Sequence, residues 1–480
     1  MGHWATMPLE AGTWYRMGST SEFKKVFGIP KGLLTIYGGD IKHTHQYIPE
    51  LFLQRLHKRI DKINKSNYKN LEKKLKRIYP LRVRAMRSVP SIYHNVKHLT
   101  NHEIASAFIK IRQWVHKVTI FDQFGWLAEE YWTPKMKAVL EDQCALKYGT
   151  DGYNRVLFAL TKPENISTTL SEKKAVLEEL KKIKSKKSTL DISSAQLAKR
   201  FGWLPVFTYG EPWGLKHYEE ELRGLLRLPL KRIEQELKEL RNYKKIRNTD
   251  IATLVKKYNI SGKELQVFID FGLAIDSRNE AEYFVSFAGF FLMPLFNEAA
   301  KRLFLSPQQL RMLTDEEFCS MLRGEISVND FPYLNATFRG WGFNRQMTWM
   351  QDFTPEEAEK LFYFVESYVK PVQGDDSGKG ICASPGKATG KVRIVPSPEQ
   401  NHKVKNGDIL FTYATTTDYL PAMKRAAAII TEVGGLTCHA AVVSREFNIP
   451  CIVALKNAMN KYKDGDMVEV DANKGIVKKL

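Results

Sequence analysis

The chain has 480 residues, of which 43% are hydrophobic, 11% aromatic and 26% charged. At roughly 100 to 200 residues per domain, this length predicts about three folded units and excludes a single small module. The hydrophobic fraction excludes a disordered chain. The formal net charge is +20. Such a charge attracts anions. It does not indicate whether the anion is a nucleotide, a phosphorylated substrate, an acidic partner or nucleic acid.

The first part of the chain divides into a short irregular region and a long helical one. Residues 1–48 are rich in Gly, Thr and Tyr and carry short β-like runs, so we expect a small irregular or hairpin-bearing cap. From residue 49 apolar side chains recur at helical spacing, and we expect residues 49–370 to be mostly helical. A Thr followed three residues later by Glu marks a helix start, because the two residues satisfy each other's free backbone N–H groups. Such boxes begin at Thr100, Thr314 and Thr354.

Two features bear on the cellular compartment. The five cysteines are scattered and form no CxxC pair, which argues against a disulfide framework and a zinc knuckle and favours a reducing cytoplasm. The most apolar stretch, residues 284–296, is shorter than the ~20 residues that span a bilayer and contains Pro294. We therefore expect a buried helix there and no membrane association. The first residues show no secretory pattern.

The composition changes near residue 370. Residues 371–378 combine Gly, Pro and charged residues without an apolar pattern, and we expect a hinge linker. Short β-like runs follow at 391–395, 408–414, 426–432, 450–455 and 467–471, with one strong helix at about 437–447. The sequence thus predicts a multidomain α+β protein, with a mostly helical N-terminal and central region and a C-terminal β/β/α domain at residues 379–480.

The segment that carries chemistry is AAAIITEVGGLTCHAAVVSREFNIPCIVAL, residues 426–455. An apolar strand is followed by a tight turn at Gly434 and Gly435, and His439 falls in the first turn of the next helix. A helix N-terminus offers unpaired N–H groups and about half a positive charge, which suits an imidazole that carries a doubly negative phosphoryl group. The glycines leave room beside the ring for a phosphate. A lone histidine in this position would more simply be a cap residue.

Three spaced elements make this region resemble a known family. They are SPGKATG at 384–390, GDIL at 407–410 and the pattern Thr-Glu-x-Gly-Gly-x-x-x-His-x-Ala-x-x-x-Arg-Glu-x-x-Ile-Pro at 431–450. Residues 379–480 thereby resemble the phosphohistidine swivelling domain of phosphoenolpyruvate-utilising enzymes, a family that includes phosphoenolpyruvate synthase, pyruvate phosphate dikinase and rifampin phosphotransferase. The resemblance implies that His439 is the phosphorylated residue. It implies supporting roles for Gly434, Gly435, Thr437 and Arg445.

The family's other modules are not apparent. Residues 1–378 are too helical and too poor in Gly-rich strand pairs for an ATP-grasp domain, and no phosphoenolpyruvate-binding barrel is recognised. The resemblance therefore implies that a separate ATP-grasp subunit or protein supplies the phosphoryl group, with Mg²⁺ and ATP bound to that partner. We expect no tightly bound cofactor on this chain. Another phosphoprotein could also be the donor.

The middle region resembles, more weakly, the helical acceptor-substrate domain of rifampin-phosphotransferase-like proteins, over residues 276–322. Within it Arg278 could clamp a phosphoryl group or an acceptor carboxylate, or form an ordinary salt bridge. Glu211 and His217 flank Trp213, and they could activate an acceptor or simply pack.

Three further histidines are candidates for a metal site. His94, His98 and His102 recur at four-residue spacing. The helix start at Thr100 breaks the face that they would share, so no metal site is expected.

Two hypotheses about function follow. The first is a phosphotransferase of the dikinase type, in which His439 carries a phosphoryl group from the ATP-grasp partner to a small-molecule acceptor bound by the helical region. The second is a non-catalytic phosphocarrier or regulatory protein, or a basic nucleic-acid-binding protein, that retains the swivelling domain. The charge of +20 and the basic run at residues 69–87 support the second, although a solvated helix face explains them equally well. Without an RRM, KH or zinc-finger pattern, nucleic acid is the less expected partner.

Overall fold

A computed structural model describes most of the chain. The described residues are 2–4, 44–46, 50–66, 69–93, 95–147, 150–206, 211–306, 309–310, 313–330, 338–343, 348–353, 356–357, 360, 379–436 and 438–480. The expected hinge at 371–378, Thr437 and the expected helix start at Thr354 lie outside them, as does most of the expected cap. The domain boundaries expected from the sequence stay predictions.

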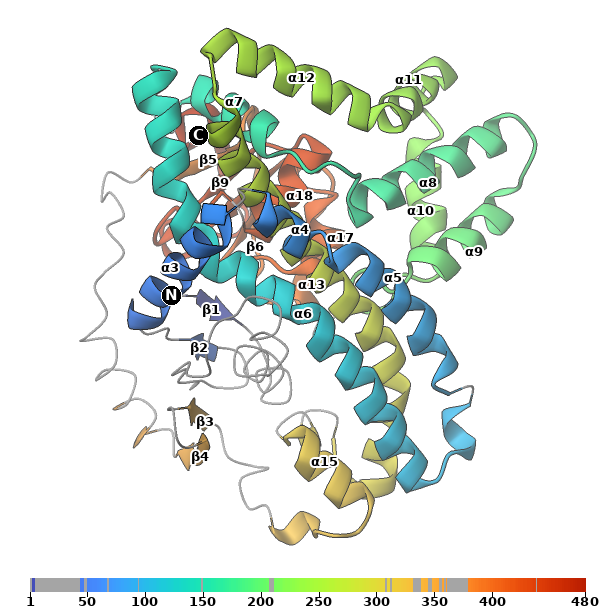
Figure 1. Cartoon of the computed structure of the whole chain (residues 1–480). Coiled ribbons are helices and arrows are strands. Elements are labelled where there is room, and N and C mark those ends of the chain that lie inside the picture. Colours follow the sequence, from blue (N-terminus) through green and yellow to red (C-terminus); the bar gives the residue numbers. More distant parts are fainter. Residues whose placement is uncertain are drawn as a thin grey trace. The chain divides into compact units, whose positions relative to one another are not determined.

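The N-terminal and central region is mainly helical, as predicted (Figure 1). Its helices are α3 (Glu50–Ser66), α4 (Asn70–Leu75), α5 (Ile78–Ser88), α6 (Asn101–Ala138), α7 (Asp151–Thr161), α8 (Thr168–Lys184), α9 (Leu190–Phe201), α10 (Leu215–Leu225), α11 (Leu230–Arg241), α12 (Tyr243–Tyr258), α13 (Gly262–Leu303) and α15 (Asp315–Leu322). Two small antiparallel sheets pair β1 (Gly2–Trp4) with β2 (Thr44–Gln46) and β3 (Phe338–Phe343) with β4 (Thr348–Phe353).

Local chemistry sets the helix ends. The Thr100 N–H donates to Glu103 Oε2 over 2.7 Å and the Glu103 N–H donates back to Thr100 Oγ1 over 3.2 Å, which confirms the expected start of α6. Thr314 and Glu317 make the same box at the start of α15. The charged helical pattern after residue 214 is divided into α10, α11 and α12, with Pro229 immediately before α11. Pro294 does not end its helix: α13 continues to Leu303.

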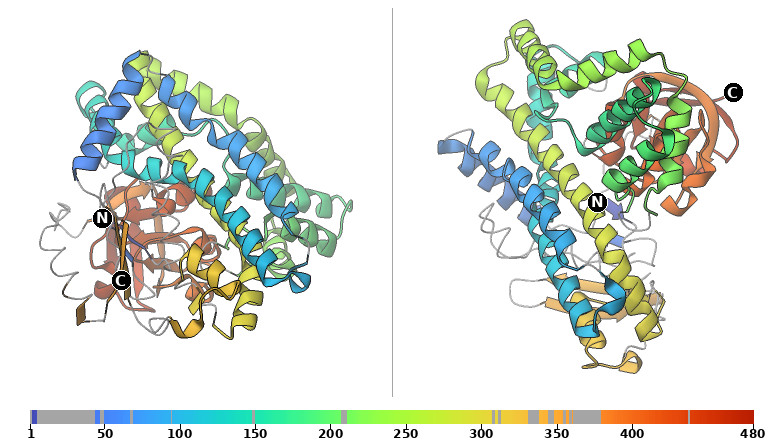
Figure 2. Two further views of the ribbon diagram at one scale, coloured as in Figure 1. Left: turned by 60° about the horizontal axis from the view of Figure 1, so that its bottom comes forward. Right: turned by 90° about the vertical axis from the view of Figure 1, so that its right-hand side faces the viewer.

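The chain forms two compact units. Unit 1 comprises residues 1–128 and 287–373, and unit 2 comprises residues 129–286 and 374–480. In unit 1 the rings of Phe108, Phe296 and Phe318 pack together with centroids 4.5–5.5 Å apart. Beside them the buried Arg112 guanidinium holds the Asp315 carboxylate through contacts of 2.9–3.1 Å. This cluster joins α6, α13 and α15, and α6 and α13 run side by side in the two views of Figure 2.

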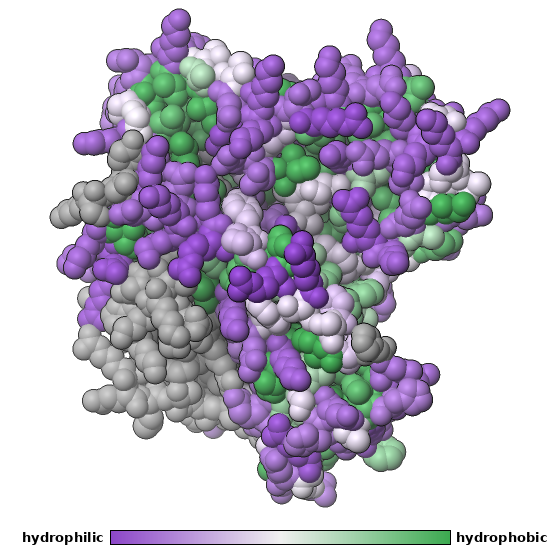
Figure 3. All heavy atoms as spheres, turned by 45° about the vertical axis from the view of Figure 1, so that its right-hand side comes forward, coloured by the Kyte–Doolittle hydropathy of each residue, from purple (hydrophilic) through white to green (hydrophobic). Residues whose placement is uncertain are grey.

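Helix α13 is long and apolar enough to cross a bilayer by length and composition alone. However, half of its most apolar window is buried inside the structure. It also carries Asp270, Asp276, Arg278, Glu280 and Glu282, all buried and all engaged in polar interactions. On the face drawn in Figure 3, hydrophilic side chains predominate and hydrophobic ones form small, separate groups. The buried, partnered charged residues are those of a helix that packs in the core of the structure.

The C-terminal part of unit 2 is built on a seven-stranded mixed sheet. Its strands are β5 (Ile381–Ser384), β6 (Lys387–Ile394), β7 (Ile409–Thr412), β8 (Ala428–Thr431), β9 (Cys451–Val453), β10 (Met467–Asp471) and β11 (Ile476–Lys479), in the order β11-β10-β6-β7-β8-β9-β5. Strands β6 to β9 are parallel, and the outer pairings are antiparallel. The helices are α17 (Leu420–Met423), α18 (His439–Phe447) and α19 (Ala458–Lys461). This arrangement confirms the predicted fold class.

Cross-strand rows of apolar residues form the core of this domain. Val392, Ile409 and Ala428 are neighbours across three strands and are fully buried. The expected strands β6 to β10 are present, whereas β5 and β11 were not expected from the sequence. Each has only four residues: two of the four are exposed in β11, whereas three of the four are buried in β5. Runs this short do not show a strong apolar pattern.

β6 approaches the turn that precedes β7 closely at Gly390. A Cβ atom at Gly390 would lie 2.3 Å from the Gly407 carbonyl oxygen, which is backbone and cannot move aside cheaply. We expect Gly390→Ala to lower the free energy of unfolding of the C-terminal domain by about 1–3 kcal/mol, measured by urea denaturation. Gly224→Ala on α10 is the control, because a Cβ there meets nothing within 4 Å. Equal stability of the two variants would contradict the prediction.

Candidate active site

His439 is the first residue of α18 and is almost completely buried, with 4% of its surface exposed. The loop before it turns at Gly434, whose φ is +115° and where a Cβ would lie 2.9 Å from Cys438 Sγ. Both facts require glycine at this position. Gly435 closes the turn by accepting a hydrogen bond from the Cys438 N–H over 3.2 Å. The turn thereby places the imidazole at the N-terminal end of α18.

One ring nitrogen of His439 has a hydrogen-bond partner among the described residues, and the other has none. Nδ1 lies 3.1 Å from Thr415 Oγ1, and Nε2 is buried with no hydrogen-bond partner among the described residues. Thr415 follows β7 and the glycine turn follows β8, two adjacent parallel strands. Carboxyl ends of parallel strands meet at one sheet edge, which is where sites in such sheets commonly form. When the Nδ1 proton is donated to Thr415, Nε2 carries the lone pair.

The surroundings of His439 keep its imidazole neutral. Burial and, to a smaller degree, the positive charge of Arg278 lower the pKa of His439 to about 3. A neutral imidazole at physiological pH has the free lone pair that a nucleophile needs. Both residues are candidates from the sequence, and in the structure Arg278 lies close enough for its charge to act on His439.

One side of helix α13 lies at this site. Arg278, Glu282 and Ser286 follow one another at four-residue spacing and therefore lie on one side of the helix. Arg278 Nε donates to Glu282 Oε1 over 3.2 Å, and both residues are buried. Ser286 Oγ lies 2.8 Å from Thr417 Oγ1, in the same loop as Thr415. Helix α13 thus provides a polar surface at the imidazole, in which Arg278 is paired with Glu282.

Arg445 connects the glycine turn to α18 through hydrogen bonds. Its Nε donates to the Ala441 carbonyl and one terminal nitrogen donates to the Leu436 carbonyl, both over 2.7 Å. Its guanidinium lies 4.3 Å from the centroid of the Phe158 ring on α7. Arg445 therefore ties the glycine turn to α18. In this arrangement it positions the loop.

The other two acceptor-site candidates lie elsewhere in the structure. Glu211 is exposed, and no described contact links it to His439. The His217 ring stacks on Trp213 with centroids 4.2 Å apart, and its Nε2 lies 3.6 Å from Glu221 Oε2. His217 thus belongs to a charged cluster around Lys424.

Lys424 follows α17 and inserts between two carboxylates from the helices. Its Nζ lies 2.9 Å from both oxygens of Glu172 on α8 and 3.1 Å from Glu221 Oε1 on α10. Although burial opposes its charge, the two carboxylates raise the pKa of Lys424. Burial raises the pKa of Glu172, which is completely enclosed. One ammonium therefore pairs with the buried carboxylate of Glu172 and the half-buried carboxylate of Glu221.

A second polar contact between α18 and the helices centres on Glu446. Thr169 Oγ1 donates to the Glu446 carboxylate and is also 2.8 Å from the Tyr283 hydroxyl. Burial raises the pKa of Glu446 to about 7. Contacts at Lys424, Glu446 and Thr417 therefore join residues 129–286 to the C-terminal domain within unit 2.

Sequence reasoning missed Thr415, Lys424 and Glu446. The run of three threonines after β7 offered a signal for Thr415, because polar residues after a parallel strand point to a site. Glu446 stands in the pattern at 431–450, but nothing local indicates its role, and no local signal marks Lys424, since their partners are more than 200 residues away in the chain.

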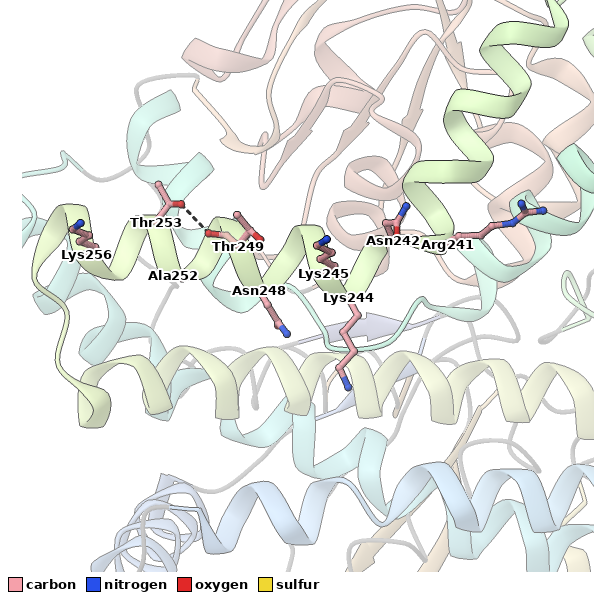
Figure 4. Close-up of a pocket in the computed structure, with 9 residues that line it drawn as sticks. All are labelled: Arg241, Asn242, Lys244, Lys245, Asn248, Thr249, Ala252, Thr253 and Lys256. Carbon is pink, nitrogen blue, oxygen red and sulfur yellow. Dashed lines mark hydrogen bonds between the residues drawn. The ribbon is translucent and has the colours of Figure 1, made fainter.

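A hollow of about 870 Å³ lies along α12 and is lined by Arg241, Asn242, Lys244, Lys245, Asn248, Thr249, Ala252, Thr253 and Lys256 (Figure 4). Its side chains are polar, but Lys244 pairs with Glu164 over 2.6 Å and Arg241 with Glu178 over 3.9 Å. No cluster of metal-binding side chains occurs among the described residues.

The raised pKa of Glu446 predicts a pH-dependent effect. Ionisation of this carboxyl costs folding stability as the pH rises above 4.5, its ordinary value, and the cost is complete above pH 7. Glu446→Gln keeps an oxygen acceptor for Thr169 and removes the charge. We expect it to stabilise the protein by roughly 1–2 kcal/mol at pH 8 and by little at pH 4.5.

Thermal unfolding at the two pH values measures this difference. Glu399→Gln, at an exposed site of the same domain, is the matched control and should show no such change. If Glu446→Gln changes the stability equally at both pH values, the pKa of Glu446 is not raised by burial.

Comparison with known proteins assigns the domain that carries His439. Residues 404–475 match the family described as "PEP-utilising enzyme, mobile domain". The chain is 57% identical to a probable phosphoenolpyruvate synthase of Archaeoglobus fulgidus over 99 residues, which are 21% of this chain and 13% of that protein. It is 45% identical to the phosphoenolpyruvate synthase of Pyrococcus furiosus over 132 residues, 28% of this chain and 15% of that protein.

A longer match is at lower identity. The chain is 33% identical over 187 residues to a probable phosphoenolpyruvate synthase of Staphylothermus marinus, covering 38% of this chain and 22% of that protein. The chain thus matches less than a quarter of the length of each of these relatives. The domain around His439, with its mixed sheet and glycine turn, is a mobile domain of the phosphoenolpyruvate-utilising enzyme family.

Proposed function

We propose that this chain is a phosphotransferase of the dikinase type that carries a phosphoryl group on His439. The observation that supports it most directly is the state of the imidazole: neutral, held at Nδ1 by Thr415, and without a described partner at Nε2. The match to a mobile domain of phosphoenolpyruvate-utilising enzymes supports the same role. Nε2 is then the atom that is phosphorylated.

The transfer takes two steps. In the first, the Nε2 lone pair attacks phosphorus and the bond from phosphorus to the donor's leaving oxygen breaks. In the second, an acceptor oxygen attacks phosphorus, the N–P bond breaks, the lone pair returns to Nε2 and the acceptor proton is released. The proton stays bonded to Nδ1 throughout and is donated in a hydrogen bond to Thr415 Oγ1, and Arg278 offsets negative charge on the phosphoryl group. Covalent catalysis divides one hard transfer into two easier ones.

The donor and acceptor are part of the proposal. We propose that a separate ATP-grasp protein, with Mg²⁺ and ATP, phosphorylates His439, and that a small-molecule acceptor is held by the helices of residues 129–286. The charge of Mg²⁺ would neutralise the nucleotide phosphates on that partner. Because His439 is 4% exposed, the C-terminal domain must leave the helices before a partner can reach Nε2. The expected hinge at 371–378 would permit this movement. A cytoplasmic location is consistent with the nucleotide donor.

The contacts that hold the domain in place suit such movement. Lys424, Glu172 and Glu221 are charged, and Ser286, Thr417, Thr169 and Glu446 are polar. Each of these groups is hydrated when the interface opens, so opening costs less than exposure of an apolar surface of the same size.

A nucleic-acid-binding role is the alternative, and the basic hollow on α12 favours it. Binding of single-stranded RNA or DNA that weakens about tenfold or more between 50 and 200 mM salt would support this alternative.

The first test of the proposal is direct labelling. With the cognate ATP-grasp protein and labelled ATP, we expect an acid-labile, base-stable label on the chain. His439→Gln should reduce it to background, and His402→Gln, at an exposed histidine of the same domain, should leave it unchanged. Equal labelling of His439→Gln and the unmodified chain would refute the proposal.

The second test concerns docking of the domain. Lys424→Met leaves Glu172 and Glu221 buried without their cation, which costs about 3–5 kcal/mol when one partner of a buried ion pair is lost. We expect the domain to open, so that diethyl pyrocarbonate modifies His439 at least tenfold faster by peptide mapping. Transfer to the acceptor should slow.

Lys403→Met is the matched control, because Lys403 is exposed and its ammonium donates to the Gln400 side chain rather than to a carboxylate. If His439 reacts no faster in Lys424→Met than in this control, the Lys424 contacts do not hold the domain closed.

A further inference from the structure

A cavity of about 710 Å³ lies beside α18, at the opposite end of the helix from His439. Helices α7, α8, α11, α12 and α13 form one wall, and Ser384, Pro385 and α18 form the other. His439 does not line it. Because an α-helix rises about 1.5 Å per residue, the lining residues Val442 and Glu446 lie roughly 4 to 10 Å along the axis from His439. The cavity volume is in the range of small-molecule sites.

Apolar side chains contribute most of the surface that lines this cavity. They include Phe158, Leu170, Leu240, Ile246 and Val442. The aromatic ring of Tyr243 adds a flat surface, and its hydroxyl donates to the Pro163 carbonyl over 3.2 Å. A ring or a branched aliphatic chain fits such a lining.

Asn279 is the polar feature without a partner. It lines the cavity and is 6% exposed, and its Oδ1 is buried with no hydrogen-bond partner among the described residues. A buried acceptor left unpaired costs about 1–3 kcal/mol. An occupant with an O–H or N–H group at this position would remove that cost.

The charged residues around the cavity already have partners. Lys173 pairs with Glu236 over 3.2 Å, and the Lys162 ammonium lies 4.7 Å from the centroid of the Tyr243 ring. Arg445 is committed to the Leu436 and Ala441 carbonyls. An ionised ligand would have to displace these contacts, so the site favours an uncharged one.

We propose that this cavity binds an uncharged amphipathic small molecule, with an apolar ring or chain and a hydroxyl or amide N–H that donates to Asn279 Oδ1. The occupant contacts both the helices and α18, so it binds only while the C-terminal domain is docked. By mass action it holds the domain closed. The proposal goes beyond phosphoryl transfer, since binding does not depend on phosphorylation of His439.

Matched probes test the binding site on the full chain. 2-Naphthol has an aromatic body and one O–H donor, and naphthalene lacks only the hydroxyl group. We expect saturable binding of both by fluorescence titration, with 2-naphthol about tenfold tighter, as one hydrogen bond to a buried acceptor would give. Asn279→Leu should remove this preference and retain naphthalene binding.

Two substitutions distinguish the cavity from other apolar surfaces. Ala159→Trp, on a lining residue of α7, places an indole in the cavity and should abolish binding of both probes. Ile192→Trp adds the same ring at an exposed position outside the cavity and should change neither affinity. Circular dichroism confirms that each variant is folded, and an unfolded Ala159→Trp protein is replaced by Ala159→Phe.

Reactivity of His439 tests the second part of the proposal. Saturating 2-naphthol should slow modification of His439 by diethyl pyrocarbonate severalfold, and it should have no effect in Ala159→Trp. Three results would each overturn the proposed binding site. They are the absence of saturable binding, a tenfold preference for 2-naphthol that persists in Asn279→Leu, and binding that Ala159→Trp leaves unchanged. If 2-naphthol binds tightly but leaves the reactivity of His439 unchanged, the occupant of the cavity does not hold the C-terminal domain closed.

Discussion

Burial of His439 beside Arg278 of α13 keeps its imidazole neutral, and the neighbouring loop and helix end hold the ring in that buried position. Thr415 fixes the ring through Nδ1, the Gly434 turn carries it to the start of α18, and Arg445 ties this turn to the helix. Arg278 adds a positive charge beside the ring. A cation near an imidazole disfavours protonation of the ring and favours a negative group attached to it. One local arrangement thus favours both the nucleophilic form and its phosphorylated product.

The same burial creates a need for movement. A histidine that is 4% exposed cannot meet a partner protein, and a phosphoryl group on Nε2 needs space that the closed interface does not offer. The contacts that close the interface are accordingly ion pairs and hydroxyl contacts, at Lys424, Ser286 and Thr169. A buried ion pair contributes little net stability, because desolvation of its charges offsets their attraction. Such an interface specifies one orientation and still opens at moderate cost.

The sequence predicted the C-terminal fold and the place of His439 because their determinants are local. The glycine turn, the apolar strands and the capping boxes at Thr100 and Thr314 each lie within a few residues. The partners of Lys424 and Glu446 come from α8 and α10, far away in the chain, so no local pattern predicts which residues these two contact. Glu211 and His217 illustrate the converse: their nearness to Trp213 in sequence suggested a shared role, whereas only His217 joins the Lys424 cluster.

Two groups at the interface respond to pH in opposite directions. The pKa of His439 falls to about 3, so closing the interface expels a proton from it between about pH 3 and its ordinary value of 6.5. The pKa of Glu446 rises to about 7, so closing takes up a proton between about 4.5 and 7. Burial also raises the pKa of Glu172, so closing takes up a proton there as well. From about pH 4.5 to 6.5 uptake at the two carboxyls exceeds release at His439, so mild acid favours the closed domain. Phosphorylation instead adds up to two negative charges at Nε2, where the closed interface leaves His439 4% exposed. Acidity and phosphorylation therefore act on docking in opposite directions.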